Sequence, residues 1–522
     1  MKKISLWALS TAFALNACAQ QNPTIVKYAQ IISADDAKKH LSILASDAFE
    51  GRETGKPGAE KAANYIAVEF KKLGLQAPVN GSYFFDVPLT VNALKVTAFT
   101  VNGKPFGYGQ DFYLTGTYPD NSINVNDVVF VGYGTENEVG TTDLTGKILL
   151  WINEDKPEDG AKPNTSYRLT AKRTATIKFL QSKNPAAILA ANAGIAGALA
   201  RFGKSVASPR LTIKDAAKAA STNAPLFNIT AALADELVKP AGKTYDEIKT
   251  ASAAAVTPAL SIKSTVAINY NTSHSDVKAV DVLGYLPGTD LKDEVLIISA
   301  HYDHIGLNPD PSAKDKVNNG ADDDGSGTTG VLEIARAFSQ AKKDGHGPRR
   351  SILFLGNVGE EKGLLGSEYY SEHPVFPLAN TITDLNIDMI GRVGEEYIGK
   401  PDSANYVYAI GSSMLSKELH DIGEQANNTY TKLNLDYKYD DPNDPNRFYY
   451  RSDHYNFAKH GVPIIFYFNG VHADYHAPGD EVSKINFPLL VKRAQLVFYT
   501  GWELANRDKR PFVDGKISQE VR

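Results

Sequence analysis

The chain has 522 residues, which is too long for one ordinary domain, so two or three domains are expected. Hydrophobic residues make up 43% of the chain and charged residues 22%, an ordinary globular balance that allows a sizeable core. The formal net charge is −5, so no basic excess points to a nucleic acid as a partner.

The first residues are typical of an export signal. Lys2 and Lys3 precede an apolar run from 4 to 15, too short to span a bilayer, and Leu15-Asn16-Ala17-Cys18 follows. This Leu-x-Ala-Cys pattern resembles the lipobox of bacterial lipoproteins, in which the Cys is acylated; the alternative is a plain signal peptide with an incidental Cys. We expect residues 1–18 to form the signal peptide and lipobox. The protein would then be periplasmic, or a lipoprotein of the outer membrane or cell surface of a bacterium, touching the membrane only through that anchor.

The next segment alternates between helical and extended patterns. Two helices are predicted within 34–75, interrupted by the Gly-rich stretch 51–58, and residues 80–112 alternate as strands do. We expect buried strands at 128–134 and 144–151, a helix at 170–181, and a strand and turn in the Ala-rich run 186–200. This stretch reads as a small β-rich insert without His or a ligand cluster. A binding or shielding role is therefore favoured over catalysis.

The C-terminal half repeats one arrangement, in which an apolar strand is followed by polar residues. The predicted strands are 295–300, 352–355, 385–390 and 462–468, and helices are predicted over 330–338, from 363, and over 487–505. This alternation predicts an α/β fold with a mostly parallel sheet covered by helices on both faces. Ligands bind at the carboxyl ends of such strands, where the polar residues lie.

Two of these polar clusters begin the candidate site. His301 and Asp303 lie at a strand end, two residues apart, so one can bind a metal while the other orients it. His304 follows directly. Three adjacent carboxylates at 322–324 repel one another and are costly to bury unless a cation neutralises them. The alternatives are an exposed acidic turn and a calcium loop, and the latter fails because Gly320 occupies the place of its first Asp.

The remaining clusters supply further carboxylates and imidazoles. Glu360 and Glu361 follow a buried strand, where one can bind metal and the other can act as a general base. Asp388 lies in a largely apolar run, in which an ionised carboxylate needs a partner. After the last strand, either His472 or His476 could be a ligand.

Together these motifs resemble peptidase family M28, the co-catalytic dizinc exopeptidases, which are mostly aminopeptidases. The resemblance covers nearly the whole chain after the signal. It rests on His301-x-Asp303, Asp322-Asp323-Asp324-Gly325-Ser326-Gly327, Glu360-Glu361, Asn386-Ile387-Asp388-Met389, Arg451-Ser452-Asp453-His454, Tyr475-His476-x-Pro478 and Phe49-Glu50-Gly51-Arg52. It implies a peptidase domain of the zinc-exopeptidase fold formed by residues 19–115 and 259–522. It also implies a protease-associated (PA) insert over 116–258.

The resemblance implies two Zn²⁺ per chain. His301 and Asp388 would hold one, Glu361 and His476 would hold the other, and Asp323 would bridge them.

The resemblance also implies the catalytic roles. Glu360 would be the general base for a zinc-activated water that attacks the N-terminal peptide bond of a peptide substrate. Asp303 would orient the metal-binding His301, and Tyr475 would stabilise the oxyanion, as a tyrosine does in some members. A cis peptide bond is implied after Asp323.

Two rivals share the fold. One is a glutaminyl-cyclase-like acyltransferase with one zinc, and the other is a non-catalytic binding homologue. The complete ligand set and the retained Glu360 count against both. A serine hydrolase is excluded, because the chain has no Gly-x-Ser-x-Gly. Residue preference, substrate length and oligomeric state do not follow from the sequence.

Overall fold

The structure is a computed structural model that describes residues 21–116, 118–157, 166–214 and 221–516. The predicted signal peptide and lipobox at 1–18 lie outside the described residues. The chain divides into two compact units, one of residues 1–88 and 278–522 and one of Leu89–Val277. The boundaries at 116 and 258 that the sequence suggested for an insert both lie inside the second unit. None of the described helices is long and apolar enough to cross a membrane.

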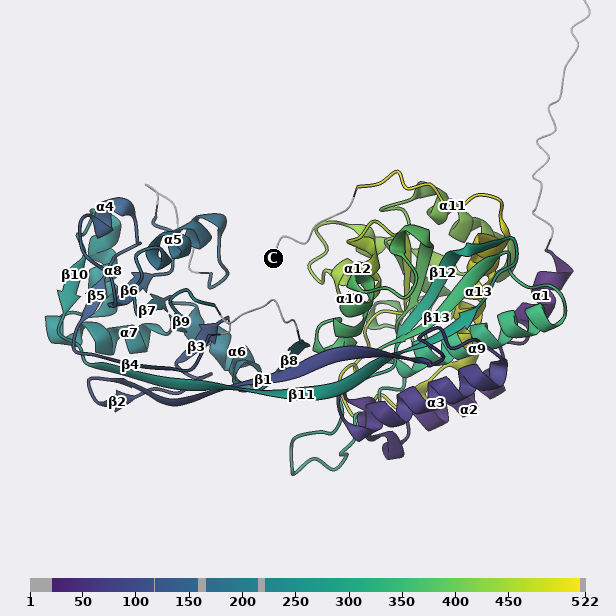
Figure 1. Ribbon diagram of the computed structural model, residues 1–522, viewed down its shortest axis with the longest axis horizontal. Coiled ribbons are helices and arrows are strands. Elements are labelled where there is room, and N and C mark those ends of the chain that lie inside the picture. Colours follow the sequence, from purple (N-terminus) through teal and green to yellow (C-terminus); the bar gives the residue numbers. More distant parts are fainter. Residues whose placement is uncertain (1–20, 117, 158–165, 215–220, 517–522) are drawn as a thin grey trace, which may run out of the picture. The chain divides into compact units, whose positions relative to one another are not determined.

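The first unit is organised around four parallel strands in the order β13-β12-β14-β17, of which Figure 1 labels β12 and β13. Their bounds are Arg350–Asn357 for β13, Leu291–His301 for β12, Thr381–Ile387 for β14 and Ile464–Phe468 for β17. Flanking strands are antiparallel to this block: β11 (Val266–Leu286) pairs with β13, and β15 (Tyr406–Ile410) pairs with β17 and carries β16 (Asn434–Asp436). The sheet is therefore mixed, and the predicted parallel arrangement holds for its centre.

Helices cover both faces of this sheet, as predicted. Ile297 of β12 lies in one apolar cluster with Tyr370 and Phe457, whereas Leu296 and Ile298 lie beside Gly501 on the opposite face. The first face carries α10 (Leu365–Glu372) and α12 (His454–Ala458), and the second carries α9 (Gly325–Lys343) and α13 (Phe487–Asn506). Further helices pack on these two: α1 (Pro23–Ala29), α2 (Ala34–Leu44), α3 (Pro57–Leu73) and α11 (Lys417–Ala426).

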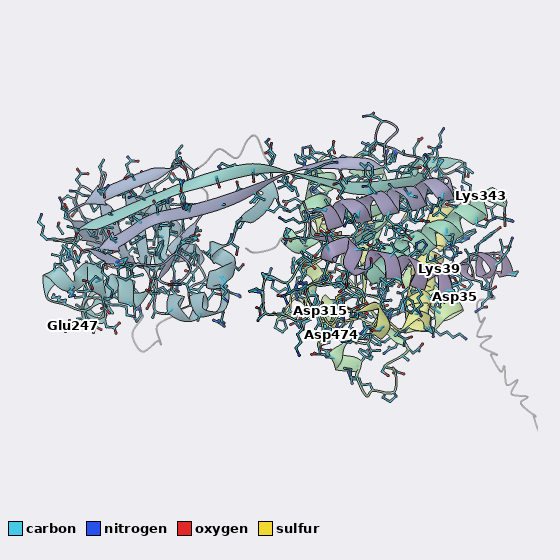
Figure 2. The ribbon with its side chains drawn as sticks, turned by 90° about the horizontal axis from the view of Figure 1, so that it is seen from below. Asp35, Lys39, Glu247, Asp315, Lys343 and Asp474 are labelled. Carbon is cyan, nitrogen blue, oxygen red and sulfur yellow. The ribbon has the colours of Figure 1, made fainter. Side chains whose placement is uncertain are left out.

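The N-terminal helices show how the sequence sets these elements. Ser33 caps α2 by accepting a hydrogen bond from the backbone N–H of Asp36. Leu41 is buried towards α9, while Asp35 and Lys39 lie on the exposed side (Figure 2). The next helix, α3, ends at Gly74, whose φ of 82° a residue with a side chain rarely adopts.

The second unit has its own sheet of six strands in the order β10-β5-β6-β7-β9-β3, parallel from β5 to β9. Their bounds are Leu260–Ile262, Val128–Phe130, Ile148–Ile152, Ala187–Ala191, Leu226–Ile229 and Phe112–Thr115. The first residues of β11 pair with β4 (Asn121–Val125), and β1 (Phe84–Val101) pairs with β2 (Lys104–Pro105) and β8 (Arg210–Ile213).

The second, smaller sheet agrees with the expected β-rich insert, and the described residues between its strands also form five α-helices. They are α4 (Glu136–Val139), α5 (Ala171–Gln181), α6 (Ile195–Ala207), α7 (Ala231–Val238) and α8 (Tyr245–Ala254). The Ala-rich run 186–200 forms β7 and then begins α6, where a strand and turn were expected. Ala and Leu are strong helix formers, and Ile195, Ala198 and Leu199 recur at helical spacing on its buried side.

Candidate metal centre

The candidate site lies at the carboxyl ends of the four parallel strands. His301 is the last residue of β12, Asp388 follows β14 directly, and Glu360 and Glu361 lie in a 3₁₀ turn three residues after β13. Gly359, with a φ of 75°, begins that turn. Asp323 precedes α9 and forms a cis peptide bond with Asp324, as the resemblance implied.

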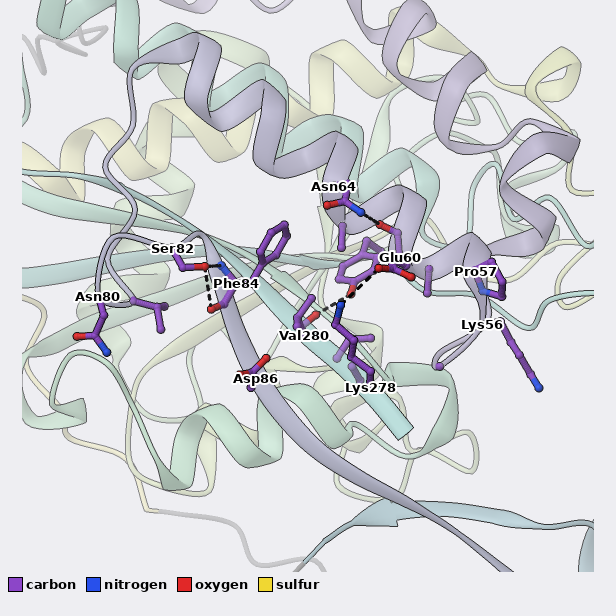
Figure 3. A pocket seen from close by; sticks show the side chains of 17 residues that line it. Lys56, Pro57, Glu60, Asn64, Asn80, Ser82, Phe84, Asp86, Lys278 and Val280 are labelled. Atoms are coloured by element: carbon purple, nitrogen blue, oxygen red, sulfur yellow. Dashed lines mark hydrogen bonds and ion pairs between the residues drawn. The ribbon is translucent and has the colours of Figure 1, made fainter. Parts of the chain in front are cut away.

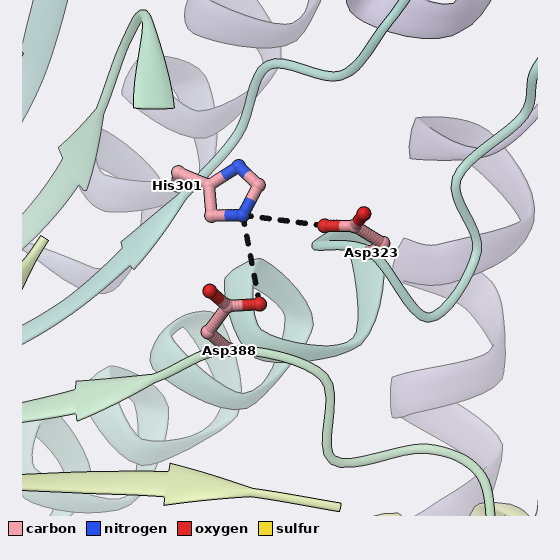
Figure 4. Close-up of side chains that lie close together, drawn as sticks. All are labelled: His301, Asp323 and Asp388. Carbon is pink, nitrogen blue, oxygen red and sulfur yellow. Dashed lines mark ion pairs between the residues drawn. The ribbon is translucent and has the colours of Figure 1, made fainter. Parts of the chain in front are cut away.

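The first of two side-chain groups surrounds Nε2 of His301. This nitrogen lies 3.4 Å from Oδ1 of Asp323 and 3.6 Å from Oδ1 of Asp388 (Figure 4). Oε2 of Glu360 is 3.9 Å away. His301, Asp323 and Asp388 are all buried, and their donor atoms are close enough together to hold one metal ion.

The second group uses the other oxygen of Asp323. Oδ2 lies 3.1 Å from Nε2 of His476, which is 3.0 Å from Oε2 of Glu361. His304 completes this group, with Nδ1 2.8 Å from Oε1 of Glu361. The five residues that the sequence suggested as ligands therefore meet, with Asp323 between the two groups. His304 was noticed in the sequence only as a neighbour of His301.

The three consecutive Asp residues have separate partners. Oδ1 of Asp324 accepts hydrogen bonds from the backbone N–H groups of Gly327 and Met389, at 2.8 and 3.0 Å. Oδ1 of Asp322 accepts from the backbone N–H of Gly391 at 2.6 Å. Both carboxylates thus hold the local backbone, and only Asp323 faces the two groups.

The orientation of His301 is set mainly by backbone. Its Nδ1 lies 3.1 Å from the carbonyl oxygen of Asp303, whereas the nearest oxygen of the Asp303 carboxylate is 3.8 Å away. The carboxylate instead accepts hydrogen bonds from the hydroxyl of Thr54 at 2.6 Å and from the backbone N–H of Glu360 at 3.2 Å. With its proton on Nδ1, His301 has the lone pair of Nε2 free to face a cation.

Two side chains in the segment that follows β17, those of His472 and Tyr475, lie differently with respect to the two metal groups. Nε2 of His472 lies 3.2 Å from Oδ2 of Asp322, so this histidine is paired away from the two groups. The ring of Tyr475 stacks on His476 with ring centroids 3.9 Å apart. The Tyr475 hydroxyl accepts a 3.2 Å hydrogen bond from Arg451.

The close carboxylates and imidazoles shift one another's pKa. Burial opposes charge on His476, but the carboxylates of Asp323 and Glu361 beside it outweigh this effect and raise the pKa of His476 to about 10. Burial likewise opposes ionisation of Asp323, while the imidazoles of His301 and His476 beside it hold the pKa of Asp323 well below its usual value. For Glu360, burial raises the pKa well above its usual value, and the negative charge of Glu361 adds to that rise.

Unsatisfied buried atoms show that the groups fit metal ions. Among the described residues, Nε2 of His301, Oδ2 of Asp323 and Oε1 of Glu361 have no hydrogen-bond partner. Such atoms are costly to bury, and a divalent cation satisfies several of them at once. Imidazole nitrogens and carboxylate oxygens are ligands that zinc accepts. The residues therefore fit two metal ions that share Asp323.

Two cavities lie near this site. The smaller adjoins the metal groups, and apart from their carboxylates it is lined by Met389, Phe448, Arg451, Phe466, Phe468, Val471 and Tyr475. The larger, of about 580 Å³, lies between the start of α3 and the strands β1 and β11 (Figure 3). Tyr302 and Val358 line it, but none of the suggested ligands does.

Comparisons with known proteins agree with this chemistry. Aminopeptidase YwaD of Bacillus subtilis (strain 168) is 27% identical over 230 residues, 42% of this chain and 43% of that protein. A probable zinc metalloprotease of Pyrenophora teres f. teres (strain 0-1) is 33% identical over 116 residues, 22% of this chain and 23% of that protein. The matched segments thus span less than half of either relative.

Solved structures and a family model extend the comparison. The structure of an aminopeptidase from Aneurinibacillus sp. strain AM-1 matches 95% of this chain and 98% of its own, with a TM-score of 0.55 and 18% identity, so the fold is similar. Residues 281–501 match the family model described as Peptidase family M28. All six side chains of the two groups lie in this segment, whose sequence is similar to peptidase family M28.

Proposed function

We propose that this protein is an aminopeptidase that hydrolyses the N-terminal peptide bond of peptides with two bound zinc ions. The observation that carries the proposal is the position of Asp323, whose two oxygens face different histidines, His301 at 3.4 Å and His476 at 3.1 Å. His301 and Asp388 would hold one ion, and Glu361 and His476 the other. Bound there, the ions would lower the pKa of a water and polarise a substrate carbonyl.

Glu360 is the proposed general base. Its carboxylate lines the cavity beside the metal groups, and its backbone N–H is held by Asp303. Burial raises its pKa, which favours a group that must accept a proton and then release it. Glu360 would take the proton of the attacking water and return it to the leaving amine. A cation beside it would oppose part of this rise.

Tyr475 and Asp303 are proposed to assist. The hydroxyl of Tyr475 accepts a hydrogen bond from Arg451, so its own proton is free to be donated to an oxyanion formed in the same cavity. Asp303 would fix the tautomer of His301 through its carbonyl oxygen and would hold Glu360 through its carboxylate.

The test is a panel of aminoacyl-nitroanilides and dipeptides, each paired with its N-acetylated form. We expect cleavage of substrates with a free amine only, loss of cleavage with a chelator, and recovery with Zn²⁺. Equal cleavage of the acetylated forms, or full activity in the chelator, would exclude an aminopeptidase that depends on metal. Cyclisation of N-terminal Gln peptides with one bound zinc would instead indicate the cyclase-like activity.

We further propose that the second unit contains a PA-like insert that binds or shields substrate, and that the protein is exported. Support for export comes from the basic and apolar start and from Leu15-Asn16-Ala17-Cys18. If Cys18 is acylated, labelled palmitate will enter the wild-type protein and not Cys18→Ala. Equal labelling, or none in either, would refute the anchor.

A further inference from the structure

His304 is a buried histidine to which the mechanism above gives no role. Its side chain is 0% exposed, and Nδ1 lies 2.8 Å from Oε1 of Glu361 and 3.7 Å from Oδ2 of Asp323. The ring is packed against Gly320, where an added Cβ would lie 2.6 Å from its Cγ and Cδ2 atoms. The backbone N–H of His304 donates to the carbonyl of Arg52 at 3.2 Å. These contacts hold Nδ1 towards the second metal group.

The short distance between His304 and Glu361 is not accompanied by a hydrogen bond. Nδ1 of His304 and Oε1 of Glu361 both lack a hydrogen-bond partner among the described residues, although they are 2.8 Å apart. A distance of 2.8 Å is short enough for a hydrogen bond, so the angle must be unfavourable. Oε1 of Glu361 therefore lies to the side of the line along which Nδ1 would donate or accept. Two donor atoms that are close but not aimed at each other can both face a third point, as ligands of one cation do.

The same pattern surrounds His301 in the first group. Its Nε2 has no hydrogen-bond partner, although carboxylate oxygens of Asp323 and Asp388 lie 3.4 and 3.6 Å away. The likeness suggests that His304 faces the second metal position as His301 faces the first.

We propose that His304 is a fourth protein ligand, through Nδ1, of the metal ion held by Asp323, Glu361 and His476. The inference rests on the proposed function only in that a metal binds there. Zinc with four protein ligands is a closed site, whereas three ligands leave a position open. The ion at His301 would therefore keep the open position, and the ion at His304 would be held more tightly.

Nuclear magnetic resonance can test which nitrogen binds. We would record long-range ¹H–¹⁵N spectra of the full chain with ¹⁵N-labelled His and bound Zn²⁺, assigning signals with single variants. We expect metal binding at Nε2 for His301 and His476 and at Nδ1 for His304. A protonated Nδ1 in His304 would mean that it donates a hydrogen bond to Glu361, and would overturn the proposal.

Metal affinity gives an independent test. Loss of a hydrogen-bond partner of a ligand costs about 10–100-fold in affinity, so loss of a ligand should cost more. We expect His304→Ala and His304→Asn to weaken one Zn²⁺ by more than about 100-fold. Wild-type affinity in His304→Asn, whose amide can still donate to Glu361, would overturn the proposal, and so would unchanged affinity in His304→Ala. His472→Ala, which removes a buried histidine paired with Asp322, should keep both ions, and circular dichroism would check that each variant folds.

These outcomes separate the inference from the proposed function. A wild-type protein that binds two Zn²⁺ but cleaves no peptide would refute the aminopeptidase proposal and leave the role of His304 intact. If the wild type cleaves peptides and His304→Ala retains both ions at wild-type affinity, the role of His304 is refuted and the aminopeptidase proposal stands.

Discussion

The hydroxyl of Ser452 donates a 2.6 Å hydrogen bond to Oδ2 of Asp388, which leaves Oδ1 of that carboxylate facing Nε2 of His301 at 3.6 Å. Ser452 in turn accepts a 3.0 Å hydrogen bond from the side-chain amide of Asn386. Two side chains, Ser452 and Asn386, therefore fix which oxygen of Asp388 faces the metal position.

We predict that Ser452→Ala weakens zinc binding by about 10–100-fold, because Asp388 can then rotate away from His301. Titration with Zn²⁺ against a competing chelator would measure it. Ser351→Ala is the matched control, since Ser351 is also buried and hydrogen-bonded but lies at the opposite end of the sheet, at the start of β13. Equal affinities in Ser452→Ala and the wild type would show that the hydrogen bond does not orient Asp388.

For Glu360→Gln we predict two intact metal sites and a turnover number lowered by about 10²–10⁴-fold, because the amide cannot accept the proton of a water. Metal analysis and nitroanilide kinetics on the same preparation would measure both. Glu361→Gln should instead lose metal, since Oε2 of Glu361 lies 3.0 Å from Nε2 of His476 in the second group. Near-normal turnover in Glu360→Gln would remove this residue from the role of base.

That His301, Glu361 and Asp388 lie close together could be predicted from sequence, because each lies in a short motif at or just after the end of an apolar strand. The strand-end rule then places His301, Glu361 and Asp388 at one edge of the sheet without any knowledge of long-range contacts. The helix at 170–181 was predicted and is α5, but α6 was missed because an apolar Ala-rich run fits a buried strand and a helix equally well.

Other features could not be predicted, because they depend on contacts between distant segments. The carboxylate of Asp303 was expected to orient His301, but only the structure shows that its carbonyl oxygen is nearer. The ring direction of His304 is set by packing against Gly320, which no local pattern reveals.

Arg52 is a second such case, and it leads to a prediction on stability. The side chain is 1% exposed and donates hydrogen bonds to the carbonyls of Tyr302 at 2.8 Å and Gly320 at 2.8 Å. It also donates to the carbonyls of Leu44 and Asn319. Arg52→Met would leave several buried acceptors without partners, each costing about 1–3 kcal/mol.

We therefore expect Arg52→Met to lower the free energy of unfolding by at least about 3 kcal/mol and to weaken metal binding, because the backbone before Asp323 loses its support. Chemical denaturation and zinc titration would measure the two effects. Arg510→Met should change stability by less than about 0.5 kcal/mol, since Arg510 makes one exposed hydrogen bond, to the carbonyl of Ala379. If both variants were equally stable, the hydrogen bonds of Arg52 to buried carbonyls would stabilise the fold no more than the exposed hydrogen bond of Arg510 does.

Asp384 ends a chain of hydrogen bonds that begins at Asp388. Beyond Ser452 and Asn386, the hydroxyl of Ser299 lies 3.0 Å from Oδ1 of Asn386 and 2.7 Å from Oδ1 of Asp384. Ser299 has one proton, and Asn386 needs it because its own amide donates to Ser452. Asp384 would then donate to Ser299 through a protonated carboxyl, the reverse of the bond in which Ser299 donates to an ionised Asp384.

Burial supports this protonation, because it raises the pKa of Asp384 to about 8, and the nearby carboxyl of Asp453 adds to the rise. Between pH 4 and 8 the folded protein would hold a proton on Asp384 that the unfolded chain releases. The free energy of unfolding should therefore fall as the pH rises through this range, by up to about 1.4 kcal/mol per pH unit from this group.

The variant Asp384→Asn tests this sign. Its amide can donate to Ser299 as the protonated carboxyl does, but it does not titrate. We expect variant and wild type to have the most similar free energies of unfolding near pH 4. As the pH rises to about 8, the variant should become more stable relative to the wild type. Urea denaturation of both proteins at matched metal concentration would measure the difference between their free energies of unfolding. The contributions of the other titrating groups cancel in this difference. A constant difference across these pH values, or one that shrinks as the pH rises, would mean that Asp384 is ionised in the folded protein and that Ser299 donates to it.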